Sequence, residues 1–488
     1  MSMLPWEDLL PEWAIKDMRW RHRAIGLLYA MTAAPGLAFT GVFGRESNDT
    51  EQGYDFCENP RMSITKLLGP TYLTTGKVIR EDLETVLVLQ DTTELDLSTQ
   101  KAMQGLGEIG NPKNRGVFLH TGFAVTPARL PVGLVSALTW VRNPDDHGKA
   151  TTRNSRRFEE KESFKWWATI QNAERVINCP GKAVHLGDRE SDIFEVLSRC
   201  VASRYRGLFR AAQDRKLLDA PHSRLWAEAE SWPVVGSRTI DVPERPAHDG
   251  VPARAARTAK LALRFGPVTI AEPGNARDGR VSVWAVLARE VDPPSATDVV
   301  EWLLLSTDPL ATPEDAWTRI DWYRCRWLIE EFHKCMKTTC KIEERQFATR
   351  GRFEICLALV MLVSVRVLFM RNIARVEPDA PAREVFSQEE ETVLRAAFEQ
   401  GGRTRLPPDL NVRCVVRMIA MLGGFLARKG DGEPGFQTLA RGDAKLAMLL
   451  QRYRLAQGLP CHLNPLLYEN ELAPAVYRRW RKDLSSLH

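Results

Sequence analysis

The sequence predicts an α/β core that is interrupted by a β-rich insertion and flanked by helical segments. Between residues 63 and about 214, short apolar runs rich in β-branched residues alternate with amphipathic stretches of helical period. From about 214 to 300 the apolar runs are punctuated by proline, and no long helical pattern occurs there. The chain of 488 residues is 44% hydrophobic and 26% charged, which is typical of a globular protein with several cores.

The core is predicted to begin with three strands and to continue with alternating helices and strands. The expected strands are residues 85–90, 116–126, 131–142, 183–187 and 205–211, and the expected helices are residues 156–178 and 191–202. Three consecutive strands followed by helix, strand, helix and strand is the order of a ribonuclease-H-like core.

The rest of the chain divides into an insertion and two helical ends. The insertion, about 214–300, holds strand candidates at residues 238–242, 260–265, 268–271 and 281–288, and long helices are expected at residues 313–346 and 352–373. Residues 1–62 look helical and end in a turn-rich stretch, 44–60, and residues 376–488 are helical after a linker-like start. We therefore expect three domains: 1–62, 63–375 and 376–488.

Composition excludes some classes of protein and leaves others open. The net charge of +5 permits a nucleic-acid partner without arguing for one, because phosphate binding depends on local clusters of Lys and Arg. The nine cysteines form no CxxC pair, which is typical of a reducing compartment. Residues 24–43 follow several acidic residues and contain Pro35, unlike a secretory signal. Residues 355–370 contain Arg366 and are too short to span a bilayer. We expect a cytoplasmic protein without a membrane partner.

Two aspartates directly follow predicted strands. Asp91 follows residues 85–90, and Asp188 follows residues 183–187. Side chains at the carboxyl ends of strands in an open α/β sheet project into a crevice, and two carboxylates there can hold Mg²⁺. Either aspartate alone could equally be a turn former or a helix N-cap.

A third carboxylate lies on the predicted helix 313–346. At 100° per residue, Tyr323, Arg326, Glu330 and Lys337 share one arc of roughly 60°. The opposite side carries apolar residues that can pack on a core, namely Cys325, Leu328, Ile329, Phe332 and Met336. A carboxylate between cations and a phenol suits a metal beside a phosphate backbone. A solvated amphipathic face with Glu–Arg pairs is the alternative interpretation.

Other site types have weaker support. Cys325, His333, Cys335 and Cys340 cluster in sequence, but no ligand pair has zinc spacing. No complete P-loop and no Gly-x-Ser-x-Gly motif is present, so neither an ATPase nor a serine hydrolase is indicated. Glu331 lies about 80° from Tyr323, off the polar arc.

The polar arc also resembles a known family signature. Tyr-(2)-Arg-(3)-Glu-(6)-Lys resembles the signature of the insertion-sequence-four family of bacterial DDE transposases, and residues 326–334 resemble the branch that contains transposon five. Further blocks resemble the family in order and spacing at residues 90–93, 120–127, 187–193, 301–305 and 435–455. Gly122 departs from the family pattern, and the N-terminal region matches only loosely.

The resemblance implies a set of residue roles. Asp91, Asp188 and Glu330 would bind two Mg²⁺ ions, for which Mn²⁺ could substitute. Phosphate contacts are implied for Tyr323, Arg326, Lys337, Lys334 and Arg210. Trp302 resembles the aromatic residue that stacks on a flipped base, although a core tryptophan on a strand is the alternative.

The resemblance also implies a reaction and partners. The expected enzyme nicks transposon ends in double-stranded DNA, passes through a DNA hairpin, and joins the 3′ ends to target DNA. Residues 1–62 would bind DNA, and residues 376–488 would form a homodimer in the synaptic complex of a bacterial cell. Two alternatives remain: a ribonuclease-H-like nuclease that cuts without joining, and a domesticated DNA-binding protein without catalysis.

Overall fold

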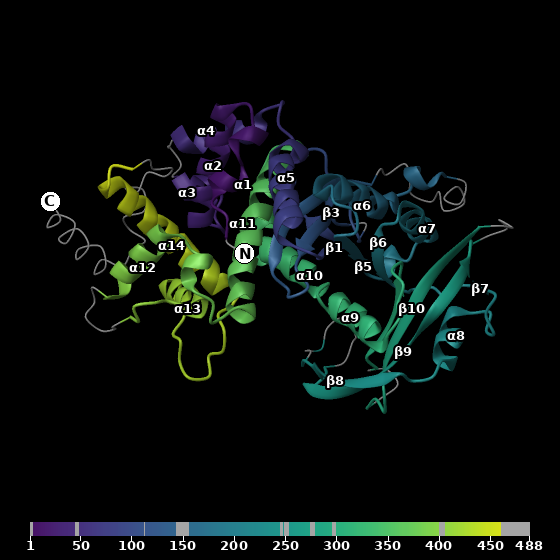
Figure 1. The fold of residues 1–488 in the computed structure, drawn as a ribbon. Coiled ribbons are helices and arrows are strands. Elements are labelled where there is room, and N and C mark those ends of the chain that lie inside the picture. The colour runs from purple at the N-terminus through teal and green to yellow at the C-terminus, as the bar shows by residue number, and fades with distance from the viewer. Residues whose placement is uncertain are drawn as a thin grey trace.

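A computed structural model describes residues 3–43, 48–111, 113–142, 156–244, 247, 253–273, 279–294, 299–399 and 406–459. The protein has a mixed α/β fold in which an eleven-stranded, mostly antiparallel sheet is flanked by helices. Figure 1 shows the N- and C-terminal helices gathered on one side of the long helix α11, with the sheet on its other side.

The strands account for most of the region predicted to be α/β. They are β1 (Val86–Asp96), β2 (Gly107–Glu108), β3 (Arg115–Val125), β4 (Pro131–Trp140), β5 (Ala183–Gly187), β6 (Arg206–Arg210), β7 (Leu217–Leu218), β8 (Gly236–Val242), β9 (Arg257–Ala271), β10 (Arg280–Glu290) and β11 (Glu301–Ser306). The helices before the insertion are α1 (Trp6–Leu9), α2 (Met18–Ala33), α3 (Phe39–Phe43), α4 (Asn48–Glu58), α5 (Ile64–Asp82), α6 (Phe164–Ile177) and α7 (Phe194–Ser203). The later helices are α8 (Leu225–Ser231), α9 (Pro313–Arg324), α10 (Trp327–Lys334), α11 (Arg350–Val376), α12 (Gln388–Glu399), α13 (Val412–Leu422) and α14 (Phe436–Ala456).

The sheet runs in the order β2-β3-β1-β5-β6-β11-β10-β9-β7, with β4 paired to β3 and β8 paired to β9. Strands β1, β5 and β6 are parallel, and the other pairings are antiparallel. Strand β1 therefore lies between an antiparallel hairpin partner, β3, and a parallel partner, β5. This position brings the carboxyl end of β5 alongside the middle of β1.

Strand β1 is buried on both faces, as its continuous apolar run predicts. Val86 and Val88 pack in a cluster with residues of α5 and α6, whereas Leu87 and Leu89 join the main core with residues of α10. Because side chains alternate along a strand, Asp91 belongs to the same face as Leu87 and Leu89. The α10 side of the sheet is thus the side on which Asp91 lies.

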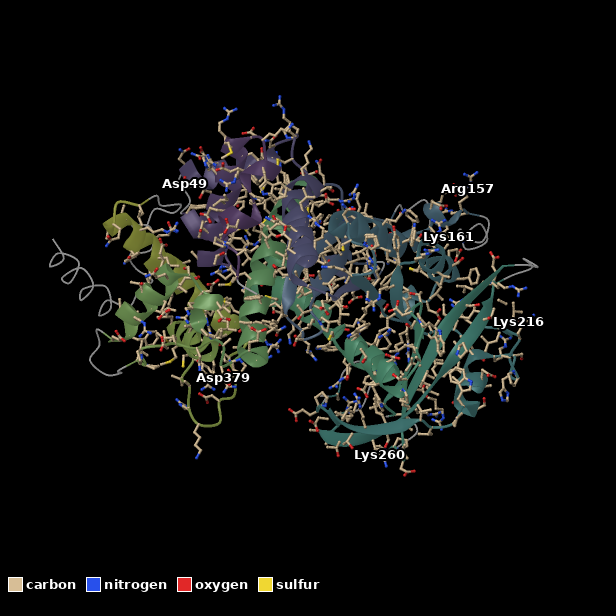
Figure 2. All side chains as sticks on the ribbon, in the orientation of Figure 1. Asp49, Arg157, Lys161, Lys216, Lys260 and Asp379 are labelled. Atoms are coloured by element: carbon tan, nitrogen blue, oxygen red, sulfur yellow. The ribbon has the colours of Figure 1, made fainter. Side chains whose placement is uncertain are left out.

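The insertion forms an arm of long strands that extends away from α11 (Figure 1). Residues predicted as two strands, 260–265 and 268–271, form the single strand β9, which pairs with β10 along its length. Lys260, labelled in Figure 2, lies on β9 opposite Thr239 of the outer strand β8. One short helix, α8, interrupts the β-rich region, and β11 returns the chain to the core by pairing with β6.

Helix α11 is the central element of the helical region. It is apolar and long enough to cross a bilayer, but 83% of its most apolar window is buried against the rest of the protein. Helices α2, α4, α5, α13 and α14 pack around it. The expectation of a core helix at residues 352–373 agrees with this burial. The turn-rich interpretation of residues 44–60 was wrong, because α4 begins within it at Asn48.

The continuous helix predicted for residues 313–346 is divided in the structure. Helix α9 ends at Arg324, and tight turns follow in which the amides of Cys325 and Arg326 donate to carbonyls three residues back. Helix α10 then runs to Lys334 and widens into a π-helical turn, Cys335–Thr339. The tight turn and the wide turn change the angle per residue, so a uniform 100° wheel does not hold from residue 323 to residue 337.

Candidate active site

Asp91 lies inside strand β1, not directly after it as predicted. The strand continues because its antiparallel partner β3 is equally long, and Asp91 pairs in register with Thr121. The shorter parallel partner β5 stays in register with β1 only as far as Leu89, which lies opposite Leu186. Two residues further along each strand, Asp91 and Asp188 reach the same level. The parallel register therefore brings these two aspartates to one edge.

Asp188 directly follows β5, as predicted, and also caps a short helix. Its Oδ1 accepts a hydrogen bond of 2.9 Å from the amide of Glu190, at the start of the 3₁₀ turn Arg189–Ser191. The tight turn requires Gly187, because a Cβ there would lie 2.4 Å from the side chain of Ser191. The N-cap interpretation of Asp188 is thus correct, and it leaves the second carboxylate oxygen available for other contacts.

Glu330 reaches the same region from helix α10. This helix packs against β1 and β3 through buried apolar side chains, and the ring of Phe332 stacks on that of Phe123 at 5.1 Å between centroids. The Glu330 carboxylate accepts a hydrogen bond of 2.5 Å from the guanidinium of Arg326. The next residue, Glu331, instead forms an ion pair of 2.7 Å with Arg371 on α11. The two neighbouring glutamates therefore have different ion-pair partners, one on the segment before α10 and one on α11.

The charges of the three carboxylates act on one another. Burial, and then the charge of Asp188, raises the pKa of Asp91 to about 7, with a further contribution from Glu330 and an opposing one from Arg326. Among the described residues, neither Asp91 nor Asp188 forms an ion pair with a lysine or arginine. Carboxylates crowded in this way, without a partner cation, suit a divalent ion with oxygen ligands.

The three carboxylates do not already surround a single point. Within the described parts of the chain, no group of three or more His, Cys, Asp or Glu side chains has the arrangement of a metal site. Glu330 is held by Arg326, so a metal ion shared by all three carboxylates would require Glu330 to turn from this partner towards Asp91 and Asp188. The donor set fits a hard divalent cation, and the side chains that carry it need a local rearrangement.

A group of phosphate-binding candidates lies beside the carboxylates. Tyr323 is buried, which raises the pKa of its hydroxyl, and the nearby guanidinium groups of Arg326 and Arg210 oppose that rise. Among the described residues its hydroxyl has no hydrogen-bond partner of ordinary geometry. Arg210 extends from β6 and donates a hydrogen bond of 2.9 Å to the carbonyl of Glu301. The structure therefore brings Tyr323, Arg326 and Arg210 together near Asp188, whose charge acts on Tyr323.

The remaining predicted DNA contacts are more dispersed. Lys337 lies in the π-helical turn, where its ammonium donates to the carbonyl of Glu94 and pairs with Glu343 at 3.4 Å. Lys334 is exposed at the end of α10. Trp302 is half-buried on β11, opposite Ala288 of β10. Lys337 and Tyr323 thus do not form the single straight stripe that the helical wheel predicted.

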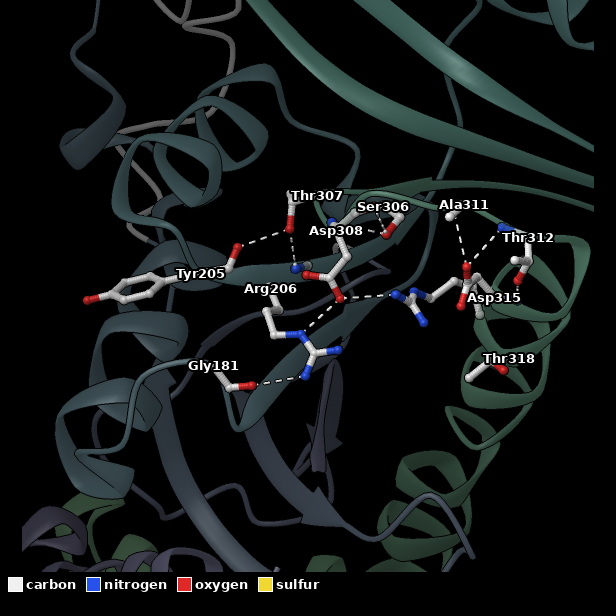
Figure 3. Close-up of polar contacts among 12 residues, drawn as sticks. Gly181, Tyr205, Arg206, Ser306, Thr307, Asp308, Ala311, Thr312, Asp315 and Thr318 are labelled. Atoms are coloured by element: carbon white, nitrogen blue, oxygen red, sulfur yellow. Dashed lines mark hydrogen bonds and ion pairs between the residues drawn. The ribbon is translucent and has the colours of Figure 1, made fainter. Parts of the chain in front are cut away.

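Ion pairs and hydrogen bonds fix the start of the segment that carries Glu330. Asp308 accepts a hydrogen bond of 2.8 Å from Arg206 on β6, and one of 3.3 Å from Arg319 on α9 (Figure 3). The hydroxyl of Thr307 accepts from the amide of Gly207 at 2.7 Å and donates to the carbonyl of Tyr205 at 3.0 Å. These contacts tie α9 to the ends of β6 and β11, which fixes the direction in which the chain enters α10.

Three titratable residues lie near the carboxylates that the sequence analysis did not place there. Lys165 on α6 approaches Asp188 and lies 5.0 Å over the ring of Trp140, and burial lowers the pKa of its ammonium. Two histidines, His120 on β3 and His333 on α10, lie buried close to β1. Burial lowers the pKa of both imidazoles, to about 3 for His333. No local motif signals them, because their partners are distant in sequence.

A comparison with known families adds an independent finding for the C-terminal region. Residues 362–460, about a fifth of the chain, match the family model described as the Transposase Tn5 dimerisation domain. The matched segment contains the second half of α11 together with α12, α13 and α14, the helical group beside α2 in Figure 1. This match supports a transposase of the Tn5 type.

Proposed function

We propose that the protein is a DDE transposase that binds transposon ends, cleaves them by metal-dependent phosphoryl transfer and joins the 3′ ends to target DNA. The observation that carries the proposal is that Asp91 on β1 and Asp188 after β5 reach one level of the sheet, where burial and the charges of Asp188 and of Glu330 on α10 raise the pKa of Asp91. The strand order β4-β3-β1-β5-β6, with its first two pairings antiparallel and its last two parallel, supports a ribonuclease-H-like core. The sequence signature supports the insertion-sequence-four family.

Asp91, Asp188 and Glu330 are the residues that would hold two Mg²⁺ ions, with Mn²⁺ as a substitute. Bound divalent ions would lower the pKa of the attacking water or 3′-hydroxyl and neutralise charge on the leaving oxygen. Arg326 holds Glu330 in the absence of metal and becomes free for a phosphate when Glu330 turns away. This exchange makes Arg326 both a partner of the third carboxylate and a candidate DNA contact.

The DNA backbone would lie across the group formed by Arg210, Tyr323 and Arg326, with Lys334 and Lys337 further along. These side chains offer a phenol and four cations to phosphates, which positions the scissile bond without reading sequence. Trp302 is half-exposed on β11, the strand that carries Glu301 beside Arg210. A flipped base that stacks on Trp302 would relieve strain in a hairpin intermediate.

The C-terminal match supports a homodimer that assembles on two transposon ends. The helices around α2 and α4 are the candidate end-binding domain, since α2 carries exposed arginines such as Arg19. Such an enzyme would act in the cytoplasm of a bacterial cell, on DNA of the nucleoid. The proposal therefore assigns cutting to the sheet, pairing of subunits to the C-terminal helices, and recognition to the N-terminal helices.

The test uses the full chain with a labelled DNA fragment that carries a transposon end and a supercoiled plasmid target. Asp91→Ala, Asp188→Ala and Glu330→Ala should each abolish Mg²⁺-dependent nicking while end binding in gel-shift assays persists. Retained nicking in any variant contradicts the assignment of that carboxylate. Nicking without joined plasmid products would favour a nuclease, and binding without any Mg²⁺-dependent nicking would favour a domesticated DNA-binding protein.

A further inference from the structure

We propose that His333 is a positioning residue for Asp91 and presents its Nδ1–H to the carboxylate. This inference rests on the proposed function, because it assigns His333 to the site that would hold the metal ions. His333 lies outside the predicted polar arc. It belongs to helix α10, and not to strand β1 or β5, which position the two aspartates. The argument uses the strand register, the two ring nitrogens and the burial of the imidazole.

The sheet places the two partners of His333 side by side. Asp91 and Thr121 lie directly opposite each other on the antiparallel strands β1 and β3, so their side chains point to the same face. Helix α10 covers that face, and His333 projects from it between the two. Its Nδ1 lies 3.9 Å from Oδ2 of Asp91, and its Nε2 lies 3.4 Å from Oγ1 of Thr121.

These two contacts select one tautomer of the ring. The imidazole is buried, and its two ring nitrogens face different oxygens, Nδ1 the carboxylate of Asp91 and Nε2 the hydroxyl of Thr121. A neutral ring carries its proton on one of these nitrogens. A lone pair on Nδ1 would face the carboxylate and repel it, whereas Nδ1–H attracts it. The Nε2 atom then carries the lone pair and accepts a hydrogen bond from the hydroxyl of Thr121. Both neighbours are satisfied only when the proton resides on Nδ1.

The consequence is that both oxygens of Asp91 have a polar neighbour. Oδ1 accepts a hydrogen bond of 2.8 Å from the backbone amide of Thr92. Oδ2 lies 3.9 Å from Nδ1 of His333, an electrostatic contact longer than a hydrogen bond that favours this orientation of the carboxylate. Groups that orient a ligating side chain typically contribute about 10- to 100-fold to metal affinity. His333 would therefore make Asp91 a better ligand without touching the metal.

The protein contains a matched control on the opposite face of β1. His120 is buried like His333, and its ring contacts Oγ1 of Thr92 at 2.9 Å and Oε1 of Gln90 at 3.3 Å. Thr92 and Gln90 alternate with Asp91 along the strand, so His120 faces away from the carboxylate. A substitution of His120 perturbs the same strand and removes a buried imidazole, but it removes no contact to Asp91.

The experiment compares His333→Phe, His333→Asn, His333→Gln and His120→Asn in the full chain. Asparagine can place an amide N–H near the position of Nδ1, whereas glutamine places it near Nε2. Calorimetric titration with Mn²⁺ measures metal affinity without catalysis, and thermal unfolding without metal measures the structural cost. We expect His333→Phe and His333→Gln to weaken Mn²⁺ binding about 10- to 100-fold. His333→Asn should retain most of the affinity, and His120→Asn should leave it unchanged.

A spectroscopic measurement tests the tautomer directly. The ¹⁵N chemical shifts of His333 should report a protonated Nδ1 and an unprotonated Nε2 in the metal-free protein. Thr121→Val removes the hydroxyl that Nε2 accepts from, so it should shift the ring towards a mixture of tautomers and weaken Mn²⁺ binding. A protonated Nε2 in the unsubstituted protein would overturn the proposal.

The outcomes separate this inference from the proposed function. Equal loss of affinity in the Asn, Gln and Phe variants, in proportion to lost thermal stability, would show a packing role only and would overturn the positioning role. Unchanged affinity in all three would overturn it as well. If Asp91→Ala also leaves Mn²⁺ binding unchanged, then the metal site itself is wrong and the proposed function fails with it.

Discussion

The sheet and helix α10 supply the candidate carboxylates in two different ways. Asp91 and Asp188 are brought together by the backbone, because the parallel register of β1 and β5 sets them at one level. Glu330 depends on side-chain packing, since α10 reaches the site by burying Leu328 and Phe332 against the sheet. The first pair is crowded and has no ion pair with a lysine or arginine among the residues that the structure describes, whereas the third carboxylate is neutralised by Arg326.

This difference indicates how charge is balanced in the metal-free site. Two carboxylates at one strand edge repel each other, so the sheet carries an electrostatic cost that a bound cation would remove. The helix carries no such cost, because Arg326 pairs with Glu330. The two aspartates, which the backbone fixes, thus repel each other, whereas Glu330, whose side chain can turn, is paired with a cation.

The largest expected effect comes from Asp91→Asn, which should abolish nicking and also stabilise the metal-free protein. The folded pKa of about 7 lies above the ordinary value of 3.8, so ionisation of Asp91 opposes folding at neutral and higher pH. With its side chain 19% exposed, we expect a gain of roughly 1–3 kcal/mol in the free energy of unfolding at pH 8.

The pH dependence and Mg²⁺ provide the controls for this prediction. Below the unfolded pKa the carboxyl is protonated in both states, so the gain from Asp91→Asn should vanish near pH 3. It should grow as the pH rises from the unfolded pKa to the folded pKa of about 7, and it should level off above that pH. Added Mg²⁺ should stabilise the unsubstituted protein by binding its folded state and so narrow the difference. Urea unfolding measures each case, and a gain of equal size at pH 3 and pH 8 would refute the electrostatic cause.

Arg326→Ala should have the next largest effect, on nicking and DNA binding, and it tests the part of the site that helix α10 supplies. Loss of the guanidinium that would position the scissile phosphate should reduce nicking about 10- to 100-fold. Loss of one phosphate contact should also lower the salt slope of DNA binding by about 1. Arg326→Lys separates the two roles, because it keeps the charge and loses the planar fork. For Arg326→Lys we expect reduced nicking with an unchanged salt slope. Nicking by this variant at the rate of the unsubstituted protein would argue against an orienting role of the guanidinium.

Trp302→Ala tests the strand that joins the insertion to the core. If a flipped base stacks on this ring, its loss should cost about 1–3 kcal/mol at the hairpin step. Hairpin formation should therefore slow by about tenfold or more, while the first nick changes little. Rapid-quench analysis of nicked and hairpin products measures the two steps. Equal slowing of both steps would favour the interpretation of Trp302 as a core residue of β11.

Local sequence patterns predicted the bounds of a strand correctly where the burial of its own side chains determines them. The strand at residues 183–187 is confirmed as β5, because a short run of buried residues ends at a glycine that the next turn requires. Strand β1 was predicted too short, since the polar residues after Gln90 look like a turn. Pairing with β3 keeps them extended as far as Asp96. A long partner strand, which no local pattern reveals, decided the difference.

The sequence predicted individual residues of the candidate site, but not the contacts between them. Asp188 after a strand and Glu330 on an amphipathic helix could be named from the sequence, and their closeness needed the structure. The break between α9 and α10 and the π-helical turn have no breaker residue to signal them. His333 could not be found, because its contact with Thr121 joins residues that are 212 positions apart.

The smallest expected effect comes from Glu331→Gln, which separates two adjacent glutamates. Glu331 pairs with Arg371 of α11, on the side of α10 that faces the helical region. Its neighbour Glu330 faces the carboxylate pair, and its charge helps to raise the pKa of Asp91. Loss of the Glu331 pair should cost about 1 kcal/mol of stability and change nicking by no more than roughly twofold. Glu330→Gln should show the reverse, with nicking lost and little change in unfolding. Similar loss of nicking in both variants would mean that α10 acts as a unit, and that one face of the helix does not carry the chemistry alone.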